Sequence, residues 1–279
     1  MIDIHCHPLP ALDDGPESLE EAVAMMRMAA DDGITHTVAT PHSNYRYAFE
    51  PEVNRKKAAE LQAAIGDVPK MLLGCDFHLS YENVQNLVDN RAQFTINGSS
   101  YVLVEFAEYF IPQQFEQVFY DIQIAGLTPI VTHPERNPVF QSHPDLVYKW
   151  VNRGCLIQVT AQSYVGGFGS QARTLAERWL GQNLVHFFAT DAHNTNRRPP
   201  LLSPCYEKVA AECGKDTADR LLIWNPEAVI NNKPLPNGPE PINSHRTGHR
   251  HKLGWLSLFT RRKRQRGPVT PETDSEIAD

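Results

Sequence analysis

Residues 101–133 read YVLVEFAEYFIPQQFEQVFYDIQIAGLTPIVTH and contain one complete β-α-β unit. The apolar run Tyr101–Phe106 predicts a buried strand, and Thr128–Thr132 predicts the next one. Between them, the apolar spacing of Gln113–Ile124 predicts an amphipathic helix. Because a helical crossover joins parallel strands, this stretch indicates a parallel sheet covered by helices.

The same alternation of short β-branched runs and amphipathic stretches extends over residues 1–232 and predicts an α/β fold. Such a fold is either an open doubly wound sheet or a closed barrel, and seven strand candidates favour a barrel slightly smaller than the eight-stranded kind. Ser18, with Glu21 three residues later, predicts a capped start for the first helix. The other strand candidates are Ile2–His5, His36–Thr40, Lys70–Gly74, Leu156–Thr160 and Val185–Thr190, and the other helical patterns are Ser18–Asp31, Glu52–Ile65, Pro144–Asn152, Gln171–Leu180 and Pro204–Ala211.

The chain of 279 residues fits one large domain with an appendage. We expect the folded domain to cover residues 1–232, a Pro-rich linker to follow at 233–244, and a flexible basic tail to occupy 245–279. The tail holds eight of the 26 Lys/Arg and four of the 33 Asp/Glu. The body therefore keeps 18 basic and 29 acidic side chains, a net charge of −11, which argues against a nucleic-acid-binding face there.

Several classes of protein are excluded by simple features of the sequence. No run approaches the roughly 18 apolar residues of a membrane span, and the start MIDIHCHPLP lacks the cationic and apolar regions of a secretory signal. The five cysteines are odd in number and form no CxxC pair, which argues against a disulfide framework. We expect a reduced, cytoplasmic protein.

Residues of the metal-ligating types stand at the carboxyl ends of six of the seven strand candidates. In a parallel α/β fold these ends share one face, where active sites form. Any one of them could be a structural histidine or a helix-capping aspartate. The whole set indicates a metal centre, because charged residues that end buried strands are costly unless they are paired or bind an ion. The candidates are His5, His7, Asp14, His42, Asp76, Glu105, His133, Asp191 and His193.

This set of candidate ligands exceeds the needs of one ion, since catalytic zinc commonly takes three protein ligands. We therefore expect a multinuclear site. Nitrogen and oxygen donors without thiolates suit zinc, manganese or iron and do not choose among them.

Two arginines closely follow candidate ligands. Arg136 stands three residues after His133, and Arg198 stands five residues after His193. Guanidinium groups bind phosphate through two parallel hydrogen bonds, and close metal pairs serve phosphoester hydrolysis. We predict that Arg136 and Arg198 are catalytic residues that hold a phosphoryl group; surface arginines that only solubilise the protein are the alternative.

These motifs resemble the PHP (polymerase and histidinol phosphatase) superfamily, and more closely its bacterial protein-tyrosine phosphatases of capsule and exopolysaccharide biosynthesis. The resemblance extends in order from Met1 to about Asn231. It rests on His5-x-His7, the Asp-Asp-Gly of residues 13–15, Thr40-Pro-His42, Glu105, His133-x-Glu-Arg136 and Asp191-x-His193-x4-Arg198-Pro-Pro.

The resemblance implies a distorted seven-stranded (β/α)7 TIM-like barrel that holds three divalent metal ions. Family members typically carry Glu where this chain has Asp76. A carboxylate one methylene shorter could draw two ions together, recruit His78 or weaken one site. The family pattern implies that His5, His7, Asp76 and Asp191 hold the first ion, that Asp76, Glu105 and His133 hold the second, and that Asp14, His42 and His193 hold the third.

The activity implied by the resemblance is that of a metal-dependent protein-tyrosine phosphatase that uses a metal-bridging hydroxide. Manganese is the expected ion, with iron or zinc as alternatives. Two other functions stay open: a small-molecule phosphomonoesterase of the histidinol-phosphate type, and a non-enzymatic metal-binding regulatory module. A cysteine phosphatase is excluded, because no cysteine here has the Arg six residues later that such enzymes need.

The expected partner is a phosphotyrosine protein, namely a membrane-associated bacterial tyrosine kinase that controls capsule or exopolysaccharide synthesis. The basic tail around Trp255 and Phe259 suits peripheral contact with the inner face of the membrane, contact with an acidic partner, or plain solvation. Tyr45–Tyr47 either line a phosphotyrosine pocket or form an exposed loop. The glycine-rich segment Tyr164–Ser170 lacks the fingerprint of dinucleotide sites and is expected to be a mobile loop.

Overall fold

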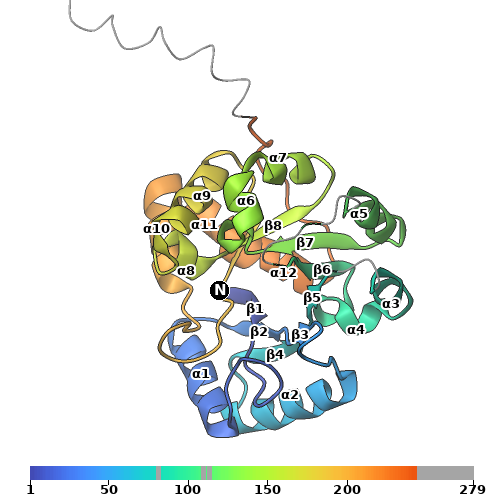
Figure 1. Ribbon diagram of the computed structural model, residues 1–279. Coiled ribbons are helices and arrows are strands. Elements are labelled where there is room, and N and C mark those ends of the chain that lie inside the picture. Colours follow the sequence, from blue (N-terminus) through green and yellow to red (C-terminus); the bar gives the residue numbers. More distant parts are fainter. Residues whose placement is uncertain (80–82, 108–110, 112–114, 244–279) are drawn as a thin grey trace, which may run out of the picture. The chain divides into compact units, whose positions relative to one another are not determined.

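The structure is a computed structural model, and it describes residues 1–79, 83–107, 111 and 115–243 (Figure 1). The predicted tail, residues 245–279, lies outside the described residues, as does the beginning of the helix predicted at Gln113–Ile124. The described part of that helix is α5 (Phe115–Ile124).

Parallel strands form the centre of the fold. Among the described residues they make a three-stranded sheet in the order β1-β2-β4 and a six-stranded sheet in the order β3-β5-β6-β7-β8-β9, and every strand pair is parallel. All seven predicted strands are present: two have the predicted bounds, three end one residue early, the first is one residue longer, and the strand predicted at Val185–Thr190 is three residues shorter. The strands are β1 (Ile2–Cys6), β2 (His36–Ala39), β3 (His42–Ser43), β4 (Lys70–Leu73), β5 (Asp76–His78), β6 (Tyr101–Glu105), β7 (Thr128–Thr132), β8 (Leu156–Thr160) and β9 (Phe187–Ala189).

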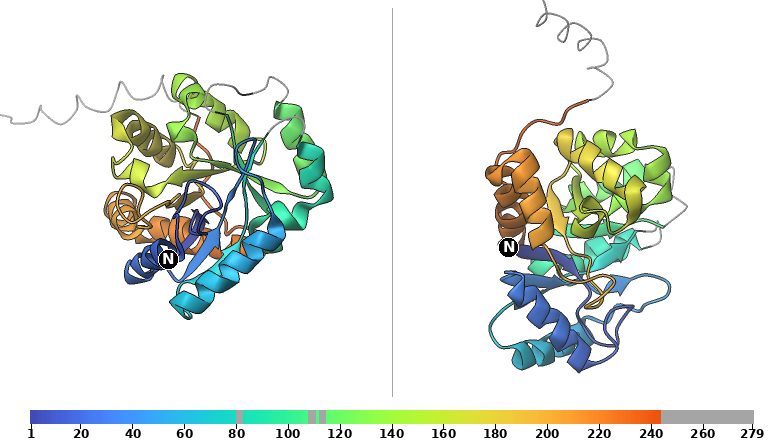
Figure 2. Two further views of the ribbon diagram at one scale, coloured as in Figure 1. Left: turned by 60° about the horizontal axis from the view of Figure 1, so that its bottom comes forward. Right: turned by 90° about the vertical axis from the view of Figure 1, so that its left-hand side faces the viewer.

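Helices lie around the outside of the strands (Figure 2), so the predicted α/β class is confirmed. The helices are α1 (Leu19–Asp31), α2 (Pro51–Ile65), α3 (Val84–Asp89), α4 (Arg91–Phe94), α5, α6 (Pro138–Ser142), α7 (Asp145–Val151), α8 (Ala161–Tyr164), α9 (Gly169–Gly181), α10 (Ser203–Cys213), α11 (Lys215–Asp219) and α12 (Asn225–Ile230), with the 3-10 turns η1 (Ile96–Gly98) and η2 (Pro134–Arg136) and the π-helical turn η3 (Arg220–Trp224). The helices predicted from the sequence correspond to α1, α2, α5, α7, α9 and α10. The sequence analysis missed the short helices α3, α4, α6, α8, α11 and α12, which hold too few turns for a periodic pattern.

The predicted cap of α1 is present. The Ser18 hydroxyl accepts a hydrogen bond from the Glu21 amide at 3.2 Å, which satisfies one of the free amides of the first turn. The Glu21 carboxylate reaches back one residue further than a capping box requires, to the Glu17 amide at 2.9 Å.

Two of the predicted strands are interrupted just before a candidate ligand. β2 and β3 are separated by Thr40-Pro41, and Pro41 has no amide to donate to a ladder. β4 and β5 are separated by Gly74-Cys75, where a Cβ on Gly74 would lie 3.0 Å from the Val38 side chain. Each break leads directly into a strand that starts with a site residue, His42 in β3 and Asp76 in β5.

The amino-terminal strand is joined to the chain segment that follows β9. The Asp191 amide donates to the His5 carbonyl at 2.8 Å, and the His7 amide donates to the Ala192 carbonyl at 2.9 Å. Cys6 and Ala192 form a parallel bridge. These contacts bring the ends of β1 and β9 together across a sequence separation of more than 180 residues.

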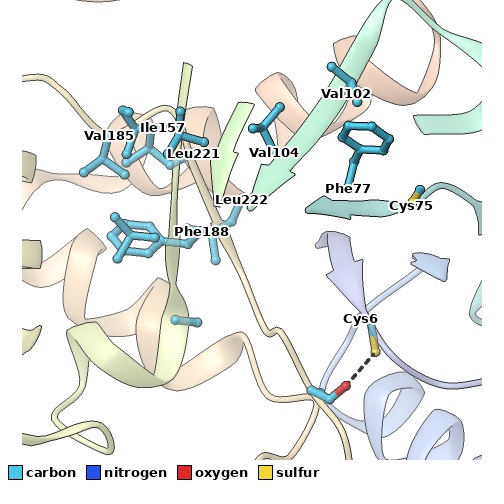
Figure 3. Packing of buried hydrophobic residues seen from close by; sticks show 14 of the residues in the cluster. Cys6, Cys75, Phe77, Val102, Val104, Ile157, Val185, Phe188, Leu221 and Leu222 are labelled. Atoms are coloured by element: carbon cyan, nitrogen blue, oxygen red, sulfur yellow. Dashed lines mark hydrogen bonds between the residues drawn. The ribbon is translucent and has the colours of Figure 1, made fainter. Parts of the chain in front are cut away.

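Both faces of the strands are buried, as in parallel sheets generally. In β6, Tyr101 and Leu103 belong to one hydrophobic cluster, whereas Val102 and Val104 belong to a second, larger cluster that includes helix residues. Figure 3 shows part of this larger cluster. Successive side chains alternate between these faces, and the strand interiors are mostly apolar; Asp3, Thr37 and Gln158 are buried polar exceptions.

The Pro-rich segment Lys233–Pro241 contains no helix or strand, as the sequence predicts. It lies against the domain: the Lys233 carbonyl accepts from the Tyr101 hydroxyl at 2.8 Å, and the Ile242 amide donates to the Gln182 carbonyl at 2.8 Å. None of the described helices has the length and apolar character needed to span a bilayer.

Trp150 should be a major source of stability, because it is 1% exposed and packs against Phe106, Phe119 and Phe140 with ring centroids 4.8–5.3 Å apart. Trp150→Ala should lower the free energy of unfolding by about 3–5 kcal/mol. Urea unfolding followed by circular dichroism measures the loss. Trp224→Ala is the matched control, since Trp224 is 42% exposed and should cost about 1 kcal/mol or less. Equal losses in the two variants would contradict this role for Trp150.

Candidate functional site

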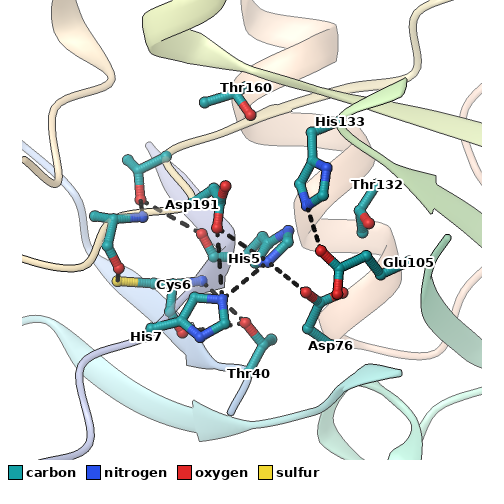
Figure 4. A network of polar contacts seen from close by, with 12 residues as sticks. His5, Cys6, His7, Thr40, Asp76, Glu105, Thr132, His133, Thr160 and Asp191 are labelled. Atoms are coloured by element: carbon teal, nitrogen blue, oxygen red, sulfur yellow. Dashed lines mark hydrogen bonds and ion pairs between the residues drawn. The ribbon is translucent and has the colours of Figure 1, made fainter. Parts of the chain in front are cut away.

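The candidate ligands predicted from the sequence come together in one cluster, and Figure 4 shows six of them: His5, His7, Asp76, Glu105, His133 and Asp191. His5 and His7 lie two residues apart at the end of β1, and their Nε2 atoms are 3.2 Å apart. The Asp191 carboxylate, which follows β9, lies 3.4 Å from the first imidazole and 3.5 Å from the second. The period of two along a strand therefore places these side chains as the sequence indicates.

All nine candidates belong to at least one group of side chains that could hold an ion. Within each group, the nitrogen and oxygen atoms offered lie within 4.8 Å of one another. The groups overlap, so the nine side chains form one continuous cluster. The groups are His7-Asp14-His42-His193, His5-His7-Asp76, His5-His133-Asp191 and His42-Asp76-Glu105.

The grouping differs in part from the three sets implied by the family resemblance. His133 lies with His5 and Asp191, although its Nε2 is also 3.7 Å from the Glu105 carboxylate. His42 lies between two groups: its Nε2 is 3.4 Å from Asp14 and its Nδ1 is 3.2 Å from Asp76. His7 joins the residues of the third set as well as those of the first.

Asp76 occupies the middle of the cluster and belongs to two of its groups. Its carboxylate is fully buried, 3.2 Å from His42 and 3.6 Å from His5. His78 lies nearby, with Nδ1 3.6 Å from the Glu105 carboxylate. A shared, buried carboxylate suits a ligand that bridges two ions.

Several buried donor atoms of the cluster make no hydrogen bond of good geometry among the described residues: both carboxylate oxygens of Asp76, Nδ1 of His42 and Nε2 of His193. Their contacts are ion pairs, with His42 Nδ1 3.2 Å from Asp76 Oδ2 and His193 Nε2 3.1 Å from Asp14. Buried polar atoms without well-formed hydrogen bonds are costly, and a cation would satisfy them. The donor set of imidazoles and carboxylates is chemically suited to divalent ions.

Two further residues orient the histidines; neither role is predicted in the sequence analysis, although Asp13 belongs to the Asp-Asp-Gly motif. Asp13 Oδ2 lies 2.7 Å from Nδ1 of His7, and Gln158 Oε1 lies 3.0 Å from Nδ1 of His5. Each contact leaves the Nε2 of its histidine directed at the cluster. Such outer hydrogen bonds fix the ring orientation of metal-binding histidines.

The charges of the cluster are strongly coupled. Burial opposes the charged form of His7, but the adjacent Asp13 outweighs burial and raises its pKa to about 9. Burial likewise opposes charge on His42, yet Asp14 and Asp76 raise its pKa to about 11. The acids of the cluster therefore favour cations, and a divalent ion would replace the protons on these imidazoles.

Both predicted arginines reach the same carboxylate. Arg136 and Arg198 each donate to Oδ2 of Asp191. Burial would raise the pKa of Asp191, but the two guanidinium groups hold it well below its usual value. His133 and Asp191 have positive φ angles of 34° and 51°, which are uncommon for residues other than glycine and gather at functional sites.

Residues 1–231 match the family of capsular polysaccharide synthesis proteins CpsB/CapC. The chain belongs to this family. The tyrosine-protein phosphatase YwqE of Bacillus subtilis (strain 168) is 35% identical over 246 residues, which cover 87% of this chain and 96% of YwqE. The tyrosine-protein phosphatase CpsB of Streptococcus pneumoniae is 28% identical over 239 residues, which cover 82% of this chain and 98% of CpsB.

The same family appears among solved structures. A crystal structure from work on YwqE of Bacillus subtilis and CpsB of Streptococcus pneumoniae, described as unique metal-dependent tyrosine phosphatases, matches with a TM-score of 0.80 at 35% identity. The match covers 87% of this chain and 100% of that chain. The family predicted from the motifs is thereby confirmed.

Two other features of this CpsB/CapC family member concern residues near the cluster. Cys6, between His5 and His7, is fully buried with its thiol 3.8 Å from the Ala192 carbonyl, so it packs in the core. Tyr45 is 97% exposed, whereas Tyr47 stacks on the His42 ring with centroids 5.8 Å apart. Of the predicted tyrosine pocket, only Tyr47 contacts the cluster through its ring.

Asp76 gives a direct test of the central carboxylate. Asp76→Glu should preserve or raise phosphatase activity, because it restores the family's usual bridging residue. Asp76→Ala should lower the metal content per chain, because it removes a ligand shared by two groups. Elemental analysis after dialysis measures the content, and Asp216→Ala, on the short helix α11, is the control. An unchanged metal content in Asp76→Ala would contradict the assignment of Asp76 as a ligand.

Proposed function

We propose that this protein is a metal-dependent protein-tyrosine phosphatase. Its relatives YwqE and CpsB are named as tyrosine-protein phosphatases, and family membership extends over residues 1–231. The observation that carries the proposal is the continuous cluster of nine nitrogen- and oxygen-donor residues beside two arginines. This arrangement suits the hydrolysis of a phosphate ester.

The cluster is proposed to hold three divalent ions, with manganese first and iron or zinc as alternatives. Support comes from the number of donors, the absence of thiolates among them and the buried donor atoms that lack a well-formed hydrogen bond. When bound, the ions supply Lewis-acid activation of water and neutralise charge on the phosphate. Asp13 and Gln158 keep the imidazoles of His7 and His5 turned toward this centre.

Arg136 and Arg198 are proposed to be the catalytic residues that bind the phosphoryl oxygens. In the structure, both guanidinium groups pair with Asp191, which is also a proposed ligand. An ion on Asp191 would compete for that carboxylate and free the arginines to donate to phosphate. Because the arginines are only about a quarter exposed, their hydrogen bonds to phosphate are stronger than in bulk water.

A covalent cysteine mechanism has no support in the chain. Cys6, Cys75 and Cys205 are buried, and burial raises the pKa of each thiol well above its usual value. A thiolate nucleophile is therefore unfavourable at these positions. The proposed reaction passes through no phospho-enzyme.

The fold around this site is proposed to be a distorted seven-stranded (β/α)7 barrel within residues 1–232. The breaks in two strands account for the two separate sheets, and the hydrogen bonds between β1 and residues 191–192 support closure. The expected substrate is a phosphotyrosine on a membrane-associated bacterial tyrosine kinase, in the cytoplasm. A small phosphomonoester of the histidinol-phosphate type is the alternative substrate.

A substrate panel tests the proposed function. Metal-loaded protein should hydrolyse a phosphotyrosine peptide with a kcat/KM at least about tenfold above that for phosphoserine peptide or histidinol phosphate. Chelation should abolish the activity, and manganese should restore it. His42→Ala should lower kcat by roughly 100-fold or more, because it removes a donor shared by two groups.

A higher kcat/KM for histidinol phosphate than for the phosphotyrosine peptide would favour a small-molecule phosphomonoesterase over a tyrosine phosphatase. A metal-replete protein inert toward every phosphomonoester would indicate the regulatory module instead.

The basic tail is proposed to bind an anionic membrane surface, where the kinase substrate would lie. Deletion of residues 241–279 removes eight Lys/Arg and should leave activity on a soluble phosphotyrosine peptide unchanged. The same deletion should reduce sedimentation with vesicles that contain phosphatidylserine. Vesicles of neutral lipid are the control, and equal sedimentation of both chains would end the membrane proposal.

A further inference from the structure

A pocket of about 300 Å³ opens beside the metal-ligand cluster. Among the described residues, its charged and imidazole lining is Glu105, His133 and Arg136, all of which belong to the proposed site. Its apolar lining consists of the rings of Phe106 and Phe168 and of Ala172, and two amide side chains also line it. This volume is at the low end of the range for ligand sites, roughly 300–1,000 Å³, and suits one small group.

Phe168 reaches this pocket from the glycine-rich segment between α8 and α9. Gly166 and Gly169 have φ angles of 101° and 88°, which side-chain-bearing residues rarely adopt. At Gly167, a Cβ would lie 2.4 Å from the Gln162 side chain, so this position accepts no side chain without a shift. The glycines therefore let the chain turn tightly and present a single large side chain, that of Phe168, to the pocket.

The Phe168 ring contacts the phosphate-binding residues. The Arg136 guanidinium carbon lies 4.4 Å from its centroid, a cation–π distance. The segment also lies near the residue that precedes the second arginine: the Gln162 amide of α8, packed against Gly167, donates to the Arg197 carbonyl at 2.9 Å. Phe168 therefore contacts Arg136 directly, and its segment is hydrogen-bonded through Gln162 to the backbone next to Arg198.

A phosphotyrosine is complementary to this pocket, because its phosphate is anionic and is joined directly to an aromatic ring. Its ester oxygen is bonded directly to the ring, so the ring must lie next to the groups that bind the phosphate. Arg136 is proposed to be one of those groups, and the apolar side chains of Phe106, Phe168 and Ala172 line the same pocket. Aromatic rings packed edge-to-face or offset gain attraction beyond burial, which an alkyl ester cannot match.

We infer that this pocket receives the aromatic ring of the substrate, and that Phe168 is the residue that makes the site select aryl over alkyl phosphates. The inference rests on the proposed phosphatase function and adds to it the place of the leaving group. The ring is bound between Phe106 and Phe168, and the phosphate is bound at the end formed by Arg136, Glu105 and His133.

The test uses the full-length, manganese-loaded protein and two pairs of probes. Phenyl phosphate and propyl phosphate report kcat/KM, while phenylphosphonate and methylphosphonate, which are not hydrolysed, report equilibrium binding by calorimetry. Phe168→Ala should lower kcat/KM for phenyl phosphate by about tenfold, and that for propyl phosphate by less than about threefold. The same change should weaken the binding of phenylphosphonate by a similar factor and leave the binding of methylphosphonate nearly unchanged. Phe168→Leu should give values between those of the wild type and Phe168→Ala.

A second variant approaches the same pocket from another wall. Ala172 is 3% exposed on α9, and Ala172→Leu would place its side chain where the ring is expected. In this variant, the binding of phenylphosphonate should weaken by a factor at least about tenfold larger than that for methylphosphonate. Tyr120→Ala, which removes a 57% exposed ring on α5 outside this pocket, is the control and should change none of the four values.

The outcomes separate this inference from the proposed function. Loss of phenyl and propyl phosphate activity in equal measure in Phe168→Ala would show that Phe168 only orients Arg136, and would overturn the inference. So would a loss of aryl preference in Tyr47→Ala but not in Phe168→Ala, since the ring would then lie on the His42 side. A wild-type protein inert toward every phosphate would defeat the proposed function, while phosphonate binding would still decide whether the pocket prefers a ring.

Discussion

The rest of the site depends on the contacts that the buried Asp191 carboxylate makes with two arginines and two histidines. This carboxylate is 2% exposed, accepts from the guanidinium groups of Arg136 and Arg198, and faces two imidazoles at 3.4–3.5 Å. A buried anion requires this many positive or polar partners, because desolvation would otherwise expel it or neutralise it. The backbone of the same residue also pairs with β1, so this one residue links the charge of the site to the joining of the first and last strands.

A second buried carboxylate, that of Asp3, stabilises the same junction. Asp3 accepts hydrogen bonds from the Thr190 amide and hydroxyl, and burial raises its pKa to about 6. Because Thr190 directly precedes Asp191, this pairing fixes the turn that carries the left-handed Asp191 backbone. The strand interiors are otherwise mostly apolar, and the candidate ligands gather at one edge of the strands.

The sequence predicted the parts of the molecule that depend on local pattern. Alternating apolar runs located the strands, and the i, i+2 spacing of His5 and His7 predicted their shared direction. The division of ligands into groups was not predictable in this way. The position of His133 beside His5 and Asp191 depends on how strands twist and which rotamers pack, and the roles of Asp13 and Gln158 depend on contacts across distant segments.

The joining of β1 to residues 191–192 also constrains the order of events during protein synthesis. Until these residues have left the ribosome, the second edge of β1 lacks its backbone partners, and His193 is missing from the ligand cluster. Strand edges in this state are prone to pair with other chains. The two groups of candidate ligands that include Asp191 or His193 can therefore form only after these residues have been translated. A nascent chain stalled before that point would expose an unpaired strand edge beside an incomplete acidic cluster.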